Sequence, residues 1–164
     1  MGSVREDYIK RSPSLPYDPK LSGRIELRKS LEKGIVGHAI STFPSECCGF
    51  LVGSSKGGAR VVESIIKAEN LKGVGRTDRF EIDPREFMDA DKVARKSGGE
   101  ILGFYHSHPD CPCYPSMTDR ERAWPEYSYI IVEMRADRSY EIKSWVLDEV
   151  SNVFIEELLV ITGK

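Results

Sequence analysis

The chain has 164 residues, of which 40% are hydrophobic and 30% charged, and its formal net charge is -2. This length is typical of one domain with its own core, and so small a charge gives no broad attraction to phosphate backbones. We therefore expect no nucleic-acid partner. No run approaches the roughly 20 apolar residues that span a bilayer, and the first 20 residues lack the apolar stretch of a signal peptide. These features predict a cytoplasmic protein with no membrane association.

The N-terminal segment differs in composition from the rest of the chain. Residues 1–23 carry three prolines among polar residues without a hydrophobic period, which predicts an extended arm ahead of a domain over residues 24–164. From Ile25 to Thr42 apolar residues recur every three or four positions, which predicts a helix that ends before Pro44. His38 lies in this helix, and we interpret it as a packing or surface residue.

The next segment favours strands and one well-marked helix. Two apolar runs at 49–54 and 60–67, separated by a Gly-containing turn, predict an antiparallel hairpin, and a third strand is expected at 79–82. Asp83 then has the features of an N-cap, since Pro84 follows it and Glu86 stands at the capping-box position. A helix over residues 84–96 is expected, ended by two glycines.

A strand over residues 100–108 runs into a proline-rich loop, after which Thr118 and Glu121 form a capping-box pattern for a short helix. Three further strands are expected, at 127–133, 139–147 and 154–161. This order predicts a single α/β (α+β) domain in which helices flank a mixed central β-sheet.

Two histidines end the strand over residues 100–108. Because successive side chains of a strand point to opposite faces, His106 and His108 share one face while Ser107 points away. Two imidazoles make half a zinc site, and a catalytic zinc takes three protein ligands and one water. Asp119 is the best candidate for the third ligand, since a stiff loop could fold its carboxylate back toward the histidines.

A purely structural interpretation of the same residues stays open at this point. His106 and His108 could end an ordinary strand while Ser116 and Asp119 cap a helix, because Ser-x-x-Asp resembles a capping signature. The scarcity of histidine argues against it: the chain has only three, and two stand beside a rigid loop, where active sites are commonly presented.

A longer pattern resembles a known family. The run from His106 to Pro109, the seven residues before Ser116 and the two before Asp119 resemble the signature of the JAMM (MPN-plus) metalloproteases. The segment from Pro44 to Gly53 is similar to the family's glutamate-bearing segment, and the runs at 103–105, 123–125 and 127–132 resemble its short bacterial branch. The resemblance covers about residues 25–160.

The resemblance implies a fold, a metal and a chemistry. The fold would be the cytidine-deaminase-like JAMM/MPN fold, with His106, His108 and Asp119 as zinc ligands. Glu46 would hold the zinc-bound water that acts as nucleophile, and Ser116 would stabilise the tetrahedral intermediate. The reaction would be hydrolysis of a peptide or isopeptide bond.

The resemblance also implies a partner. Family members act at the C-terminal Gly-Gly tail of a ubiquitin-like protein, and the short bacterial branch implies a sulfur-carrier protein bearing cysteine or another adduct. A tail of this kind could add along a sheet edge. The sequence leaves the oligomeric state open, a homodimer included.

Two other function classes use similar residues. A non-catalytic zinc-binding MPN scaffold or interaction module is the alternative, although every expected ligand position is filled. A zinc nucleobase deaminase needs His-x-Glu and Pro-Cys-x-x-Cys, whereas this chain has His-x-His and Cys-Pro-Cys.

The four cysteines fall in two clusters, unlike a secreted disulfide framework, and are expected to be reduced thiols. Cys111 and Cys113 depart from the family pattern. They could add a ligand, form a redox-sensitive lid, or be loop variation without a metal role, which we favour. One of Cys47 and Cys48 is expected in the core.

Overall fold

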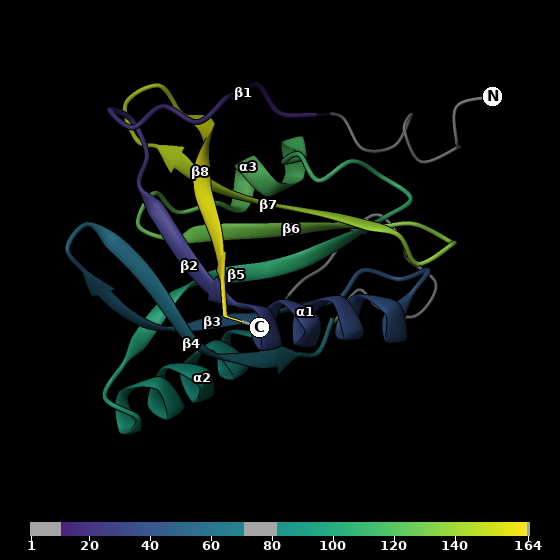
Figure 1. The fold of residues 1–164 in the computed structure, drawn as a ribbon, viewed down its shortest axis with the longest axis horizontal. Coiled ribbons are helices and arrows are strands. Elements are labelled where there is room, and N and C mark those ends of the chain that lie inside the picture. The colour runs from purple at the N-terminus through teal and green to yellow at the C-terminus, as the bar shows by residue number, and fades with distance from the viewer. Residues whose placement is uncertain (1–10, 71–81, 164) are drawn as a thin grey trace.

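The computed structural model describes residues 11–70 and 82–163, and eleven helices and strands lie in these ranges (Figure 1). The helices are α1 (Lys29–Thr42), α2 (Pro84–Lys96) and α3 (Met117–Arg122). The strands are β1 (Ser14–Leu15), β2 (Arg24–Arg28), β3 (Cys48–Lys56), β4 (Ala59–Ala68), β5 (Glu100–Pro109), β6 (Ser128–Met134), β7 (Tyr140–Asp148) and β8 (Val153–Thr162). No helix of the described ranges is long and apolar enough to cross a membrane.

The strands form one mixed sheet that closes on itself. Its order is β1-β8-β2-β4-β3-β5-β6-β7, and β8 also pairs with β7. One half of β8 pairs with β7 and the other half with β2, so the two ends of the sheet meet at this strand. Figure 1 shows β8, in yellow, beside β2. The expected single α/β domain with a mixed sheet is therefore confirmed, and the sheet is more curved than a flat layer.

The two longer helices cover opposite faces of the sheet. Leu51 of β3 and Tyr105 of β5 pack in one cluster with α1, whereas their neighbours Phe50 and Phe104 pack with α2. Because side chains alternate along a strand, these two clusters lie on opposite faces. Cys47 belongs to the α1 cluster and both Cys47 and Cys48 are buried, so the expectation that one of them lies in the core is confirmed twice over.

The helix expected from Ile25 begins instead at Lys29, so the prediction was wrong over its first four residues. Ile25 and Leu27 lie in β2, where both are fully buried and pair with β4 and β8. The buried positions of β2 alternate with more exposed ones, which is the period of a strand. Ile25 and Leu27 also happen to continue the three- and four-residue spacing of α1, so the predicted helix began too early. His38 packs in α1 as expected, with its Nδ1 2.8 Å from the Tyr105 hydroxyl.

Most of the other expected elements are confirmed within two residues of their predicted ends. The side chain of Asp83 caps α2 by accepting from the N–H of Arg85. Glu86 does not complete a capping box, since its carboxylate accepts from the N–H of Glu69 at the end of β4. The strand expected at 79–82 lies outside the described residues except for Ile82, which is not in a strand.

Residues 11–23 run along the sheet. β1 pairs in parallel with the start of β8, and the N–H of Ser12 donates to the carbonyl of Pro115 at 2.9 Å. Arg11 forms a bridge with Ser116, and its guanidinium lies 4.1 Å from the centre of the Tyr114 ring. This segment therefore contacts the loop that precedes α3.

Candidate metal centre

His106 and His108 end β5 and face the same side of the sheet as Phe104, away from α1. Both are 1% exposed, and their Nε2 atoms lie 3.1 Å apart. The spacing of two residues in a strand produces this arrangement, as the sequence predicted. Two imidazole nitrogens at this distance, buried and facing each other, leave room for a shared proton or a shared cation.

Asp119 reaches the two histidines from the first turn of α3. Its Oδ1 lies 3.3 Å from Nε2 of His106, and its Oδ2 lies 3.4 Å from Nε2 of His108. The three side chains form a group whose candidate ligand atoms all lie within 4.8 Å of one another. The structure therefore brings together the three residues that the sequence singled out.

A capping box places Asp119 there. The hydroxyl of Ser116 accepts from the N–H of Asp119 at 3.0 Å, and Oδ2 of Asp119 accepts from the N–H of Ser116 at 2.7 Å. The predicted cap at Thr118 was wrong, because Thr118 lies inside the helix and Ser116 is the N-cap. The capping interpretation and the clustering of Asp119 with the histidines thus hold together, since the cap fixes the carboxylate that faces the imidazoles.

The charges of this group are strongly coupled. Burial lowers the pKa of His106. Burial also lowers the pKa of His108, but hydrogen bonding to Asp119 and the charges of Asp119 and Glu46 outweigh it and raise the pKa to about 9. Burial raises the pKa of Asp119, and the two imidazoles outweigh this and hold it well below its usual value. Asp119 therefore favours a proton on His108, and the imidazoles in turn favour the ionised form of Asp119.

The loop after β5 orients His108. The Nδ1 of His108 donates to the carbonyl of Pro112 at 2.8 Å, which directs Nε2 toward Asp119 and His106. The neighbouring carbonyl of Cys113 accepts from the indole of Trp145 at 3.0 Å, so the loop is itself held on β7. Sequence reasoning did not identify Pro112, because a backbone acceptor can belong to any residue type; only the proline-rich composition of the loop pointed to a rigid support.

Glu46 lies just before β3 and is 3% exposed. Cys48 pairs with His106 in the antiparallel β3–β5 ladder, so two residues earlier Glu46 stands opposite His108. The N–H of Ser107 donates to the carbonyl of Cys47 at 3.1 Å, which extends the ladder to this point. The register and the influence of the Glu46 charge on the pKa of His108 both place this carboxylate beside the group.

The distances within the group fit a tetrahedral zinc. Zinc binds imidazole nitrogen and carboxylate oxygen at about 2.0–2.2 Å, so tetrahedral ligands lie about 3.3–3.5 Å from one another. The two Nε2 atoms lie 3.1 Å apart, and each lies 3.3 or 3.4 Å from a different oxygen of Asp119, so the three side chains are close enough to share one zinc. Three protein ligands would leave the fourth position open, which is the pattern of catalytic and not of structural zinc sites.

The thiols of the Cys-Pro-Cys loop do not belong to this group. Cys111 and Cys113 are buried and form no disulfide within the described residues, and burial raises the pKa of Cys113 to about 12. Ligand atoms of Cys113, Glu133 and Glu141 also lie within 4.8 Å of one another, but Arg135 lies 3.0 Å from Glu133 and 4.0 Å from Glu141. The two carboxylates of that second cluster are therefore already paired with the guanidinium of Arg135.

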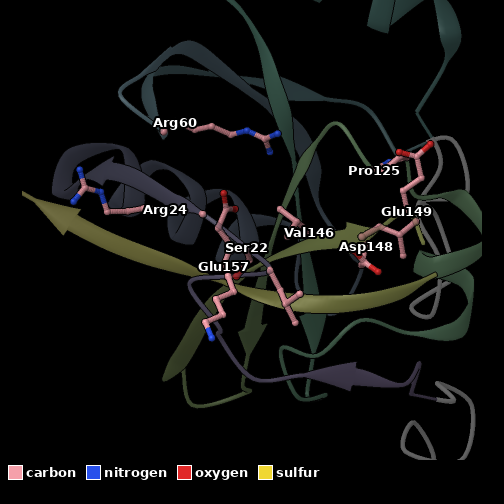
Figure 2. Close-up of a pocket in the computed structure, with 13 residues that line it drawn as sticks. Ser22, Arg24, Arg60, Pro125, Val146, Asp148, Glu149 and Glu157 are labelled. Carbon is pink, nitrogen blue, oxygen red and sulfur yellow. The ribbon is translucent and has the colours of Figure 1, made fainter. Parts of the chain in front are cut away.

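A pocket of about 500 Å³ lies away from the candidate metal centre (Figure 2). Arg60, which lines it, donates to the hydroxyl of Ser128 at 2.6 Å, and Ser128 pairs with Gly103 at the opposite end of β5 from His108. At about 3.3 Å per residue this is about 16 Å along the strand. None of the residues discussed above for the metal centre lines this pocket. Its lining carries charges of both signs, from Lys20, Arg24, Arg60, Asp148, Glu149 and Glu157.

Comparisons with known proteins agree with this geometry. Residues 28–148 match the model of the Prok-JAB family, described as prokaryotic homologs of the JAB domain. A desampylase of Haloferax volcanii is 35% identical, with 78% of this chain and 92% of the relative covered. A CysO-cysteine peptidase of Mycobacterium bovis is 32% identical over 73% of this chain and 80% of the relative.

Two solved structures show the same fold. The solution structure of a Desulfitobacterium hafniense protein has a TM-score of 0.76 at 33% identity, with 85% of this chain and 94% of the other covered. The crystal structure of a JAB1/MPN domain protein from Archaeoglobus fulgidus has a TM-score of 0.51 at 21% identity, with 84% and 98% covered. The fold expected from the resemblance is thus confirmed as a JAB/MPN fold, and the chain belongs to the family of prokaryotic JAB-domain proteins.

Proposed function

We propose that this protein is a zinc metallopeptidase of JAMM type, in which His106, His108 and Asp119 hold the metal. The observation that carries the proposal is the convergence of these three side chains: the two Nε2 atoms lie 3.1 Å apart, and the two Asp119 oxygens lie 3.3 and 3.4 Å from them, which is close enough to share a tetrahedral zinc. Glu46 would act beside this group as the acid–base residue, and Ser116 as a hydrogen-bond donor. The neutral form of His108 needed for a ligand is favoured when a cation replaces the proton between the imidazoles.

Each side chain has a separate task in amide hydrolysis. When bound, zinc polarises a carbonyl as a Lewis acid and lowers the pKa of water from 15.7 to about 7. Glu46 accepts a proton at its carboxylate as water attacks the scissile carbonyl, and then delivers that proton to the leaving amine. The hydroxyl of Ser116 accepts from the N–H of Asp119, so its own proton is available to the developing oxyanion.

We propose that the substrate is the C-terminal tail of a ubiquitin-like or sulfur-carrier protein ending in Gly-Gly. The supporting observations are the names of relatives: desampylase, CysO-cysteine peptidase and probable TtuB-protein conjugate cleaving protease. All three names describe release of a group joined to another protein or to cysteine. Peptide and isopeptide bonds to such a tail share the carbonyl that the mechanism requires.

The variant Glu46→Gln tests the function. Purified protein is incubated with carrier proteins whose Gly-Gly tail bears either a C-terminal cysteine or an isopeptide-linked lysine, and products are measured by mass spectrometry. Wild type is expected to release the tail, and Glu46→Gln to keep one zinc per chain while turnover falls by at least about 100-fold, because the proton acceptor is lost.

The control is Glu149→Gln, which changes an exposed carboxylate in the remote pocket and is expected to leave turnover unchanged. Undiminished cleavage by Glu46→Gln would remove this carboxylate from the mechanism. Tight binding of the carriers by zinc-loaded wild type, with no cleavage of either linkage, would instead support an interaction module.

A further inference from the structure

One peptide group next to the candidate metal centre is held at both of its polar atoms by side chains. In the peptide between Glu46 and Cys47, the carbonyl of Glu46 accepts from Nδ2 of Asn70 at 3.0 Å, and the N–H of Cys47 donates to Oγ of Ser107 at 2.9 Å. The next carbonyl, that of Cys47, accepts from the N–H of Ser107. Ser107 of β5 and Asn70, two residues beyond the end of β4, therefore fix the same peptide at its two polar atoms.

This peptide fixes the backbone from which the Glu46 side chain extends. A peptide unit is planar and rigid, so fixing its carbonyl and its N–H fixes the Cα of Glu46 at one corner of the plane. Glu46 lies two residues before Cys48, the first residue of β3. The two side-chain hydrogen bonds therefore hold the chain at the point where it enters this strand.

Ser107 links this peptide to the imidazoles through its place in the sequence. It stands between His106 and His108, and alternation along β5 turns its side chain to the opposite face, where it is fully buried. The same three-residue run thus presents both imidazoles on one face and fixes the Glu46–Cys47 peptide on the other. Any shift of this peptide relative to β5 changes the separation between the carboxylate and the imidazoles.

We propose that Ser107 and Asn70 are positioning residues for Glu46, holding its carboxylate at the place where it exchanges protons with water. The inference rests on the proposed function and adds to it two residues that contact neither metal nor substrate. Hydrogen bonds that support reactive groups in this manner typically change activity by 10–100-fold when removed, and a displacement of 1 Å can change it by about 10²-fold.

The first experiment compares Ser107→Ala and Asn70→Ala with wild type in the carrier-protein assay. Each variant is expected to lower kcat by about 10–100-fold with KM unchanged, because substrate contacts are retained while Glu46 is misplaced. Zinc content is expected to stay at one per chain. Ser107→Thr keeps a hydroxyl at the same position and is expected to restore kcat.

The matched control is Ser144→Ala. Ser144 is also fully buried, and its hydroxyl donates to Glu157, which lines the remote pocket, at 2.8 Å. The substitution therefore removes a comparable hydrogen bond elsewhere in the sheet. It is expected to lower the unfolding midpoint about as much as Ser107→Ala and to leave kcat unchanged. An equal fall in kcat for the two serine variants would show that kcat falls because the protein is less stable, and this result would overturn the proposal.

The second experiment repeats the substitutions in a Glu46→Gln background under single-turnover conditions. Residues that act only through Glu46 are expected to cause no further loss there, since effects within one catalytic unit are strongly non-additive. A further 10-fold loss in that background would show that Ser107 and Asn70 act by another route.

A crystallographic measurement separates this inference from the proposed function. In zinc-soaked crystals of Ser107→Ala, the Glu46 carboxylate is expected to move or to lose order while the two imidazole rings keep their positions. An unmoved carboxylate would refute the positioning role even if the enzyme is active. A moved carboxylate would support it even if none of the carriers is cleaved, an outcome that would count against the proposed substrate alone.

Discussion

His108 combines three interactions in one side chain. Its Nδ1 donates to the carbonyl of Pro112, its Nε2 faces Asp119, and the charge of Glu46 acts on it from the start of β3. In the absence of a cation these groups outweigh burial and raise its pKa to about 9, which favours its protonated form. The same arrangement is well suited to a divalent cation, which would take the place of that proton.

Replacing this imidazole tests the ligand set. His108→Ala is expected to lose zinc, because two remaining ligands bind a cation far more weakly than three. Zinc is measured by metal analysis after dialysis against a weak chelator. His38→Ala serves as the control: it removes the buried contact to Tyr105 and lowers stability, but zinc is expected to remain at one per chain. Full zinc content in dialysed His108→Ala would remove His108 from the ligand set.

The α3 cap shows how one short element serves two purposes. The side chain of Ser116 satisfies an N–H at the start of the helix, and Asp119 accepts in return while its other oxygen faces His106. A six-residue helix has little stability of its own, so this capping box and the pairing of Arg11 with Ser116 hold it in place.

Two substitutions separate the two roles of Ser116. Replacing an N-cap serine by alanine costs about 0.5–2 kcal/mol, whereas glycine costs only a few tenths. Ser116→Gly is therefore expected to unfold at nearly the wild-type midpoint and Ser116→Ala at a lower one. If the hydroxyl donates to the oxyanion, both are expected to lose about 10²–10³ in kcat. Thermal unfolding and the cleavage assay measure the two effects, and full activity in Ser116→Gly would leave Ser116 with the structural role only.

The sequence predicted elements best where local signals were strong. The cap of α2 at Asp83 and the shared face of His106 and His108 depend on neighbouring residues, and both were predicted correctly. Strand β2 was not predicted, since Ile25 and Leu27 owe their strand to pairing with β4 and β8, which are distant in sequence. The hydrogen bond from His108 to the carbonyl of Pro112 could not be predicted either, because it depends on the conformation of the loop after β5.

At the scale of the whole molecule, the sheet closes around a buried polar network. Glu157 of β8 is 3% exposed and accepts from Ser144 of β7, while Arg60 of β4 reaches the hydroxyl of Ser128 in β6 (Figure 2 shows Arg60 and Glu157). Four strands therefore meet through these side chains. The sequence contained no indication of this closure, because strands far apart in the chain join at β8.

Glu157 gives the fold a pH dependence. Burial raises its pKa above the ordinary value of 4.5, and the hydrogen bonds from Ser128 and Ser144 and the charge of Arg60 offset this only in part. Because the folded protein binds this proton more tightly, the associated stability is present below pH 4.5 and is lost as the pH rises through the folded pKa. The variant Glu157→Gln has no ionisable group at this position, so its stability is not lowered by ionisation there as the pH rises.

We therefore expect Glu157→Gln to be more stable than wild type at about pH 8 and to lose that advantage at about pH 4. Unfolding midpoints at the two pH values measure the difference. Glu149→Gln, in the same pocket but exposed, is the control and should show no such pH-dependent difference. A constant offset between Glu157→Gln and wild type at both pH values would contradict the assignment.

The contact between residues 11–12 and the loop before α3 has a consequence for handling the protein. Lys20 is exposed within the segment that leads from β1 to β2, so trypsin can reach it. Cleavage there would turn the first strand into a separate peptide, whose contacts in the described residues include its pairing with β8, the bond from Ser12 to Pro115 and the contacts of Arg11 with Tyr114 and Ser116. The dissociation rate of that nicked peptide would then report how often the loop bearing Ser116 opens.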